Sequence, residues 1–546
     1  MKRRHFLQSM SAATSIGGAA AVAAVAPGAA AAQPSAEPPA PAADTRFEWL
    51  EASAADLGRA MAEGRTTALA LVRAYAERIE TIDGAGPRLA SIIQFNPDAE
   101  AIAAQLDAER AAGRLRGPLH GIPVVLKDNI ATADRMETSA GSPALVGIRP
   151  PRDATVVTKL RAAGALVLAK TNLSEWANFR GKASISGWST RGGQTRNPYA
   201  LDRSPSGSSS GTGAAVAANL CALGVGTETD GSITSPASVS ALVGFKPTVG
   251  LVSRSGIVPI AFSQDTAGPM CRSVADTALL LSVLAGPDPH DRSTAAQAGK
   301  IDLRALAKPA PDALKGARIG VAMNLVEGHG RATVALFDAA LRALEASGAT
   351  LIRAPLPNLE KMGAGELDVL QFEMREAMAA YLAEFAAAGP YRTLPDLIAY
   401  NRAHPETLAL FGQEWFEGAE AKGPLKASAA YRKALGDGWR YARTLGIDAM
   451  QTKHRLDAIV APTGGPAWFI DPINGDAIAG PSATTPAAVA GYPHVTVPMG
   501  QVSGLPVGIS FFAGAWQDAR LLALAAHFER ATGQRKPPRY LASSGG

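Results

Sequence analysis

A loop rich in serine and glycine, Ser206-Gly207-Ser208-Ser209-Ser210-Gly211, lies near the middle of this 546-residue chain. A second element of small residues, Asp230-Gly231-Ser232, follows it, and Lys127 lies upstream at the end of the apolar run Val124-Val125-Leu126. Small residues let backbone N–H groups approach a reacting carbonyl group closely, and burial can neutralise a lysine. Together these elements supply a nucleophile, a proton relay and a base without any histidine, which is typical of a hydrolase.

Strands and helices alternate around these loops. Residues 122–126 form an apolar run that predicts a buried strand, whose carboxyl end delivers the lysine. A helix is expected next, with Asp153 as its N-cap and Gly164 as its stop, followed by a strand at residues 165–169. Another helix is predicted at residues 214–220, so that its N-terminal N–H groups face the serine loop.

The same alternation returns later in the chain. Residues 318–323 and 350–353 are predicted strands, and residues 334–344 between them place their apolar side chains on one helical face. Strands that alternate with helices indicate a largely parallel sheet covered by helices. Near the C-terminus, residues 495–497 and 507–511 are expected to pair as strands and to close the sheet.

Three motifs resemble the amidase signature family, whose members use a Ser–cisSer–Lys triad. They are Gly-Ile-Pro-Val-Val-Leu-Lys-Asp at 121–128, the serine loop at 206–211, and Gly-Thr-Glu-Thr-Asp-Gly-Ser-Ile at 226–233. The resemblance extends from about Trp49 to about Glu529. It implies an α/β fold with a large mixed, mostly parallel β-sheet that helices cover on both faces.

Within this family, three segments look most like the bacterial peptide amidases. These segments are residues 175–181, 193–199 and 228–232. The resemblance implies that the chain hydrolyses the C-terminal amide of peptides, and that no metal ion or organic cofactor is needed.

Three residues are expected to act together in catalysis. Ser232 is the predicted nucleophile because it follows a glycine in a tight turn after the strand-like run at 221–226. The resemblance implies that Ser208 lies between Ser232 and Lys127, passes the proton between them, and follows a cis peptide bond. Lys127 is then the base.

Lys127 must be neutral to accept a proton. Lowering its pKa from about 10.4 to near 7 costs about 4.6 kcal/mol, which burial can supply. His120 is the nearby alternative base, but a Ser–His pair would lack an identifiable third member, so His120 is expected to be structural. A phosphate-binding loop is disfavoured because Ser210-Gly211-Thr212-Gly213 lacks the lysine that such a loop needs.

The surroundings of the triad can be assigned in part. Ser209 and Glu228 are predicted to support it, Glu228 as an acceptor for the serine loop or, equally, as an exposed salt-bridge partner. An apolar acyl pocket has three aromatic candidates that could instead pack the core, Trp176, Phe179 and Trp188. An oxyanion hole is expected from four backbone N–H groups, those of Thr229, Asp230, Gly231 and Ser232.

Three positions depart from the commoner pattern of the family. Asp230 stands where many members have glycine, Thr234 where many have arginine, and Ser206 where glycine is frequent. Asp230 puts a carboxylate beside the acyl site, and Thr234 removes a charge that could pair with it. We therefore expect uncharged acyl groups to be preferred.

Composition limits the other classes of protein. Hydrophobic residues make up 47% of the chain and charged residues 18%, which is a globular balance. Residues 1–32 hold three of the 53 basic residues and no acidic one, so the formal charge of +5 falls to +2 without them. Such a charge does not indicate a nucleic-acid partner. Cys221 and Cys271 lie in apolar stretches, where a buried free thiol is commoner than a disulfide.

The N-terminus has the pattern of an export signal. Arg3-Arg4 is followed by a weakly apolar Ala/Gly run and by the small residues Ala30-Ala31-Ala32. We expect residues 1–32 to be a twin-arginine signal peptide that is read by the twin-arginine export machinery and cleaved, and residues 33–44 to be a Pro/Ala-rich linker. A stable membrane anchor needs a longer and more apolar run. The protein is therefore expected to be periplasmic or secreted.

A single amidase domain is expected over residues 45–546, as a monomer, with a helix-rich section at about 306–446 that shapes the substrate entrance. Two other functions stay open. One is an aryl or aliphatic amidase of the same family. The other is the glutamine-hydrolysing subunit of a tRNA-dependent amidotransferase complex, against which the export signal argues, since charged tRNA is not expected outside the cytoplasm. A catalytically dead binding protein is disfavoured because all three triad positions are present.

Overall fold

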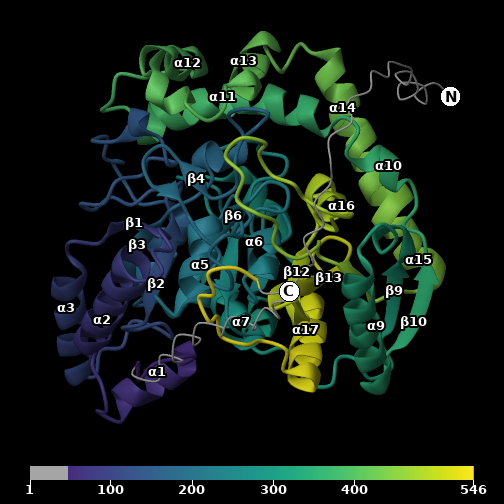
Figure 1. Cartoon of the computed structure of the whole chain (residues 1–546), viewed down its shortest axis with the longest axis horizontal. Coiled ribbons are helices and arrows are strands. Elements are labelled where there is room, and N and C mark those ends of the chain that lie inside the picture. Colours follow the sequence, from purple (N-terminus) through teal and green to yellow (C-terminus); the bar gives the residue numbers. More distant parts are fainter. Residues whose placement is uncertain (1–46, 545–546) are drawn as a thin grey trace, which may run out of the picture. The chain divides into compact units, whose positions relative to one another are not determined.

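Within residues 47–544, which the computed structural model describes, an eleven-stranded mixed β-sheet forms the centre of the fold (Figure 1). From one edge to the other the strands follow the order β1-β3-β2-β6-β8-β7-β12-β13-β11-β9-β10. Their bounds are β1 (Ile92–Phe95), β2 (Pro123–Lys127), β3 (Leu166–Thr171), β6 (Leu223–Glu228), β7 (Val243–Lys246), β8 (Thr266–Cys271), β9 (Arg318–Ala322), β10 (Thr350–Ala354), β11 (Ala458–Pro462), β12 (His494–Val502) and β13 (Leu505–Phe512). A separate hairpin consists of β4 (Trp188–Ser189) and β5 (Gly193–Gln194).

The strand β2 lies between β3 and β6 and is parallel to both. Every residue of β2 is buried, as the apolar run predicts. Because the carboxyl ends of parallel strands meet at one edge of a sheet, Lys127 at the end of β2 comes next to the residues that end β6. The site lies at the carboxyl ends of these interior strands.

Parallel and antiparallel pairs occupy different parts of the sheet. The pairs β2/β3, β2/β6, β9/β10 and β9/β11 are parallel, and the other strand pairs of this sheet are antiparallel. A parallel pair needs a crossover, usually a helix, whereas neighbouring antiparallel strands need only a turn. The α/β class and the mixed sheet are confirmed, but the antiparallel share of the sheet is larger than expected.

The strands β12 and β13 pair as predicted, but they do not close the sheet at an edge. They lie between β7 and β11 and so join its two halves. All eight residues of β13 are buried, which fits a central strand covered on both faces.

Helices fill the segments between the strands. The bounds of the first nine α-helices are α1 (Ala54–Ala62), α2 (Ala68–Arg78), α3 (Ala99–Ala111), α4 (Thr155–Ala162), α5 (Ser210–Ala217), α6 (Thr234–Val239), α7 (Val274–Leu284), α8 (Leu303–Ala307) and α9 (Arg331–Ala346). Those that follow are α10 (Leu359–Met362), α11 (Glu366–Phe385), α12 (Leu394–Ala403), α13 (Glu414–Ala421), α14 (Ala429–Trp439), α15 (Asp448–His454), α16 (Thr484–Ala490) and α17 (Asp518–Thr532).

Two sets of helices cover the central strands. The helices α4, α7, α17 and α9 contact one another in that order and pack on the sheet, and α5 and α6 form a second set against β2, β6, β7 and β13. All residues of β6, β7 and β8 are buried, so both faces of these strands are covered.

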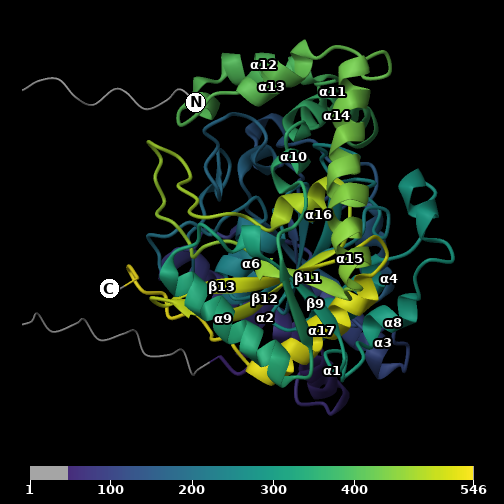
Figure 2. The same ribbon diagram turned by 90° about the vertical axis from the view of Figure 1, so that its right-hand side faces the viewer.

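The helices α11 to α14 form a cap at one end of the molecule. Figures 1 and 2 both show this cap above the sheet. The helix-rich section expected at 306–446 is therefore narrower, because β9, α9 and β10 within it belong to the sheet and its cover. The cap itself runs from residue 366 to residue 439.

Two helix starts differ from the prediction. Asp153 does not cap α4, since its Oδ1 accepts a hydrogen bond from the backbone N–H of Ala133 at 2.7 Å and Ala154 is the N-cap residue. The helix after the serine loop begins earlier, at Ser210. Gly164 ends its segment as expected, with a φ of +84°.

The expected free thiols are confirmed, because Cys221 and Cys271 are both buried and unpaired. The expected signal peptide at 1–32 and linker at 33–44 lie outside the described residues. Among the helices of residues 47–544, none is long and apolar enough to cross a membrane.

Candidate active site

Lys127 and Ser208 are in direct contact. The Nζ atom of Lys127 donates a hydrogen bond to Ser208 Oγ at 2.7 Å and another to Thr227 Oγ1 at 2.8 Å. Asn129 Nδ2 donates to the same Thr227 hydroxyl at 2.9 Å. The predicted base and the predicted relay therefore meet at the carboxyl ends of β2 and β6, with Thr227 fixing the position of the amine.

The environment of Lys127 favours its neutral form. The side chain is fully buried, and burial lowers its pKa to about 7, although the carboxylates of Asp265 and Glu228 act in the opposite direction. A general base works best when its pKa lies near the operating pH. Lys127 has that property.

The serine loop is tightly constrained around Ser208. The peptide bond between Gly207 and Ser208 is cis, as the family resemblance implies. A Cβ atom on Gly207 would lie 2.2 Å from Ser174 Oγ, so only glycine fits there. Ser206 has a φ of +60°, a conformation that glycine adopts without cost, which explains why glycine is frequent at this position.

Ser232 lies in the turn after β6, with 9% of its surface exposed. Gly231 before it has a φ of +77°, and a Cβ atom there would lie 3.1 Å from Thr484 Oγ1. Ser209 joins this turn to the serine loop, because its N–H donates to the carbonyl oxygen of Ser232 at 3.1 Å. Its hydroxyl also donates to the carbonyl oxygen of Thr227 at 3.0 Å. Ser209 thus ties the serine loop to the end of β6 and to the turn of Ser232.

The backbone of the turn offers hydrogen-bond donors. Within residues 47–544, the N–H groups of residues 229–232 donate to no protein acceptor, whereas the next two N–H groups, of Ile233 and Thr234, both donate to Glu228 Oε2. The four N–H groups predicted to form an oxyanion hole, those of Thr229, Asp230, Gly231 and Ser232, are therefore available to a substrate oxygen.

Glu228 has a different role from either alternative considered for it. It is buried, so it is not an exposed salt-bridge partner, and it accepts from the segment after Ser232 rather than from the serine loop. The hydroxyl of Thr234 donates to it as well, at 3.1 Å. Glu228 consequently fixes the start of α6 behind the nucleophile.

Many members of the family have arginine at the position of Thr234. In this chain a buried lysine supplies a positive charge instead. Lys246 ends β7, is fully buried, and its pKa is lowered to about 8 by burial against the opposing effect of Glu228, Asp518 and Asp230. Burial raises the pKa of Glu228 and of Asp230, and the charge of Lys246 opposes this rise. Sequence reasoning missed Lys246 because it depends on the neighbouring strands rather than on nearby residues.

Asp265 is a second residue near the site that sequence reasoning missed. Its Oδ1 accepts from the hydroxyl of Thr229 at 2.6 Å, and its Oδ2 accepts from the backbone N–H groups of Ile260 and Ala261 at 2.9 Å each. The signal that could have found it is the pairing of β6 with β8, in which Glu228 stands opposite Thr266.

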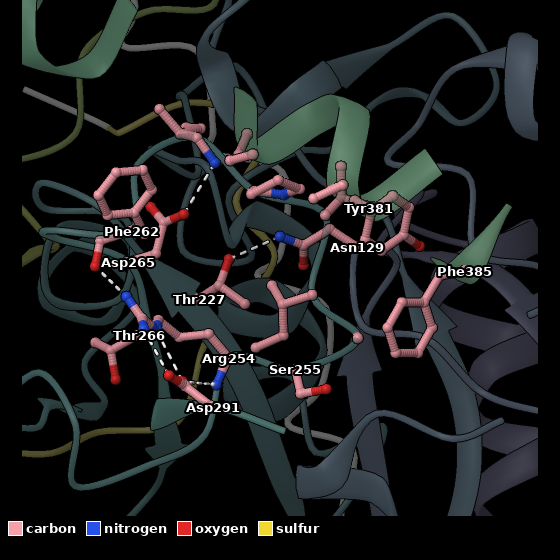
Figure 3. Close-up of a pocket in the computed structure, with 18 of the residues that line it drawn as sticks. Asn129, Thr227, Arg254, Ser255, Phe262, Asp265, Thr266, Asp291, Tyr381 and Phe385 are labelled. Atoms are coloured by element: carbon pink, nitrogen blue, oxygen red, sulfur yellow. Dashed lines mark hydrogen bonds and ion pairs between the residues drawn. The ribbon is translucent and has the colours of Figure 1, made fainter. Parts of the chain in front are cut away.

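A cavity of about 290 Å³ adjoins this site (Figure 3). Thr227, Thr229 and Asn129 form part of its wall, and Tyr381 and Phe385 of the cap helix α11 form another part. Four further apolar residues line it, Ile257, Val258, Ile260 and Phe262.

An ion pair neutralises the charge of Arg254, an arginine in the wall of this cavity. Arg254 donates to Asp291 through Nε at 2.8 Å and through Nη2 at 2.6 Å. Figure 3 shows this pair at the cavity wall. The cavity therefore suits an uncharged group better than a carboxylate.

The three aromatic candidates for the acyl pocket pack elsewhere. The rings of Trp176, Phe179 and Trp188 lie against a segment of the cap, with centroid distances of 5.5 Å to Phe416, 6.3 Å to Trp415 and 5.2 Å to Phe411. Residues from α11 and from 257–262 line the cavity in their place, because α11 crosses it.

His120 has a structural role, as expected. Its Nδ1 accepts from the N–H of Arg116 at 3.1 Å, and its Nε2 lies 2.9 Å from the carbonyl oxygen of Leu106. In the described part of the chain, no group of three His, Cys, Asp or Glu side chains is arranged to hold a metal ion.

Comparisons with known sequences agree with this geometry. The family model for amidases matches residues 70–522. The chain is 40% identical over 509 residues to a probable amidase of Arabidopsis thaliana, an alignment that covers 91% of this chain and 93% of the relative. It is 36% identical over 507 residues to a glutamyl-tRNA(Gln) amidotransferase subunit of Symbiobacterium thermophilum, with 90% and 99% covered.

Solved structures agree as well. The peptide amidase from Stenotrophomonas maltophilia matches with a TM-score of 0.86 and 50% identity, over 90% of this chain and 99% of that one. The complex of peptide amidase PAM with the competitive inhibitor chymostatin matches with the same values. The protein described here belongs to the amidase signature family, whose members hydrolyse carbon–nitrogen bonds.

Proposed function

We propose that the protein removes the C-terminal amide of peptides and that Ser232, Ser208 and Lys127 carry the reaction. The observation that supports this most is the 2.7 Å hydrogen bond between Lys127 and Ser208, formed by a fully buried lysine whose pKa is lowered to about 7. Such a lysine can take up and return a proton near neutral pH.

The reaction has two halves. Ser232 Oγ attacks the amide carbon while its proton passes to Ser208 Oγ, which gives its own proton to Lys127 Nζ. The N–H groups of residues 229–232 donate to the oxyanion that forms, and each such donor contributes about 3 to 4 kcal/mol of transition-state stabilisation. The proton then returns through Ser208 to the leaving nitrogen, ammonia departs, and water hydrolyses the acyl-enzyme.

Two observations favour a peptide amide as the substrate. The chain is 50% identical to a peptide amidase over 90% of its length, and peptide amidase PAM binds the competitive inhibitor chymostatin. The cavity beside the site has apolar walls and a neutralised arginine.

The carboxyl group of Asp230, beside Ser232, also favours a peptide amide as the substrate. Asp230 immediately precedes Gly231 and Ser232. Burial raises the pKa of its carboxyl group, and the hydroxyls of Thr484 and Thr485 and the charge of Lys246 oppose that rise and favour the ionised form. Two like charges about 4 Å apart repel by about 4 kcal/mol at an effective dielectric of 20. A free C-terminal carboxylate near the scissile bond is therefore disfavoured, whereas a carboxamide is not.

The test is a matched pair of peptides of one sequence, one amidated and one with a free carboxyl end. We expect ammonia release from the amide with a kcat/KM at least about a hundredfold above that for cleavage of the acid. Asp230→Asn should narrow this difference, and Ser232→Ala should abolish both reactions. Equal cleavage of the two peptides would remove the proposed specificity.

A second candidate function is glutamine hydrolysis within an amidotransferase complex, because the chain is 36% identical to a component of such a complex over nearly all of that component's length. Ammonia release from free glutamine, with a kcat/KM equal to that for peptide amides, would favour this candidate. Release from small aryl or aliphatic amides alone would favour a broader amidase instead.

A further inference from the structure

Glu366 is the first residue of α11, the cap helix that lines the cavity with Tyr381 and Phe385. Its Oε1 accepts a hydrogen bond from Gln264 Nε2 at 2.8 Å. The same nitrogen of Gln264 donates to the carbonyl oxygen of Thr229 at 3.3 Å. Gln264 therefore ties the start of the cap helix to the turn that carries Ser232.

Asp230 forms a second link between the same two elements. Its Oδ2 accepts from the hydroxyl of Thr485 at 2.6 Å, and the hydroxyl of Thr484 also interacts with its carboxyl group. The carboxyl groups of Asp230 and Glu366 lie close enough to each other for a hydrogen bond between them. Two carboxyl groups can form such a bond only when one of them keeps its proton. The two acids thus share one proton.

The surroundings place that proton on Glu366. Glu366 is half-buried among apolar side chains, which raises its pKa, and the negative charge of Asp230 raises it further. No other ionisable residue of the described chain lines the small space around Glu366, whose other walls come from α10, α14 and α16 and include Met362, Leu435 and Val489.

Two other charges face Asp230. Lys246 of β7 attracts its carboxylate, and Glu228 of β6 lies close enough to interact with it. The stable arrangement is a neutral Glu366 that donates to a charged Asp230.

We propose that Glu366 is a positioning residue, which in its protonated form holds the cap helix against the turn of Ser232 and which releases that helix when it ionises. The inference rests on the proposed function, because it concerns the same turn and the same cavity.

Ionisation of Glu366 would disturb both parts of the site. Two adjacent carboxylates repel each other, so the hydrogen bond between α11 and the turn is replaced by repulsion. The N–H of Asp230 is one of the oxyanion donors, and α11 supplies one wall of the cavity. We therefore expect kcat to fall in the alkaline range, which gives a bell-shaped pH profile whose acid limb belongs to Lys127.

The first experiment measures kcat and KM for ammonia release from an amidated peptide between about pH 6 and about pH 10. In Glu366→Gln the side-chain amide still donates to Asp230 but cannot ionise, so the acid limb should stay and the alkaline fall should disappear. Asp368→Asn is the matched control, since Asp368 is an exposed acid on the same turn of α11 and pairs with Lys422. Its profile should equal that of the unaltered protein.

An unchanged alkaline limb in Glu366→Gln would overturn the inference. So would loss of that limb in Glu373→Gln instead. Glu373 is the fully buried acid of α11, its pKa is raised to about 7 by burial, and it accepts from Ser263 N–H and the hydroxyl of Tyr431.

A second measurement does not depend on turnover. Hydrogen–deuterium exchange of the α11 peptides should accelerate in the alkaline range beyond the intrinsic rise in the unaltered protein, and not in Glu366→Gln. Equal protection in the two proteins at every pH would contradict the inference. If no amide is hydrolysed at all, the proposed function fails, but the exchange result still decides the role of Glu366.

Discussion

At the scale of single residues, the pKa of Lys127 is the central property of the proposed site. In water a lysine is almost fully charged at neutral pH, whereas complete burial lowers the pKa of Lys127 to about 7. The opposing carboxylates of Asp265 and Glu228 stop the pKa from falling further. This pKa supports the proposal that Lys127 acts as the base without a histidine.

The pH dependence of the reaction follows from this pKa. Because the neutral amine is the active form, kcat/KM should rise as the pH increases through about 7. At about pH 5 it should be about a hundredfold below its plateau, two pH units under the pKa. A profile that stays flat down to this pH would assign the base to another group.

Removal of the base gives a second test. Lys127→Ala should lower kcat by about three orders of magnitude or more with little change in KM, because the triad acts as one proton-transfer unit. Ser208→Ala should have an effect of similar size for the same reason. Steady-state kinetics on one amidated peptide measures both, and near-normal turnover in Lys127→Ala would contradict the assignment.

The residues that sequence reasoning found are those with a local signal. Lys127 ends an apolar run, and Ser208 and Ser232 lie among glycines, so short motifs reveal them. Lys246, Asp265 and Glu366 carry no such motif, since each reaches the site through a strand pairing or a helix packed from a distant part of the chain. Local pattern predicts the triad but not the charges around it.

At the scale of elements, one buried arginine connects the segment after β3 to the cap. Arg180 pairs with Glu175 with both side chains fully buried, and its guanidinium lies 4.2 Å from the ring centroid of Phe411. The carbonyl oxygen of Arg180 also accepts from the N–H of Trp415 at 3.0 Å. Arg180, held by Glu175, therefore joins the segment after β3 to the start of α13.

Breaking this pair should destabilise the protein. Glu175→Gln leaves the charge of Arg180 buried without its partner, which costs about 3 to 5 kcal/mol of unfolding free energy. Asp312→Asn, which breaks the exposed pair with Lys315, should cost less than about 1 kcal/mol. Urea unfolding of the two variants compares them, and equal losses would show that the buried pair does not hold the cap.

Element boundaries were predictable where one segment decides its own structure. The strand β2 was found because its apolar run is continuous, and α9 because its apolar face repeats at helical spacing. The place of β12 and β13 in the middle of the sheet was not predictable from the sequence, because strand order depends on contacts between distant segments. Asp153 was assigned wrongly as a cap because the competing donor, the N–H of Ala133, comes from another part of the chain.

At the scale of the whole molecule, the sheet and the cap have different tasks. The sheet brings Lys127, Thr227 and the turn of Ser232 to one edge, and the cap closes the cavity over that edge with α11 (Figures 1 and 3). We therefore propose that the sheet carries the chemistry and that the cap shapes access to the cavity, one wall of which α11 lines.

Export of the whole chain is proposed from its first residues. Replacing both Arg3 and Arg4 by Lys should trap the protein in the cytoplasm, because the twin-arginine pair is what the export machinery reads. Cell fractionation shows where the protein accumulates, and N-terminal sequencing of the exported form should begin near Gln33. A mature protein that begins at Met1 would exclude cleavage.

The most direct test of the central claim is to trap the acyl-enzyme and locate it. The protein is quenched with acid during turnover of an amidated peptide, digested, and analysed by mass spectrometry. The proposed mechanism predicts an acyl adduct on Ser232, which Ser232→Ala lacks and which forms far more slowly in Lys127→Ala. An adduct on another residue, or undiminished ammonia release by Ser232→Ala, would contradict it.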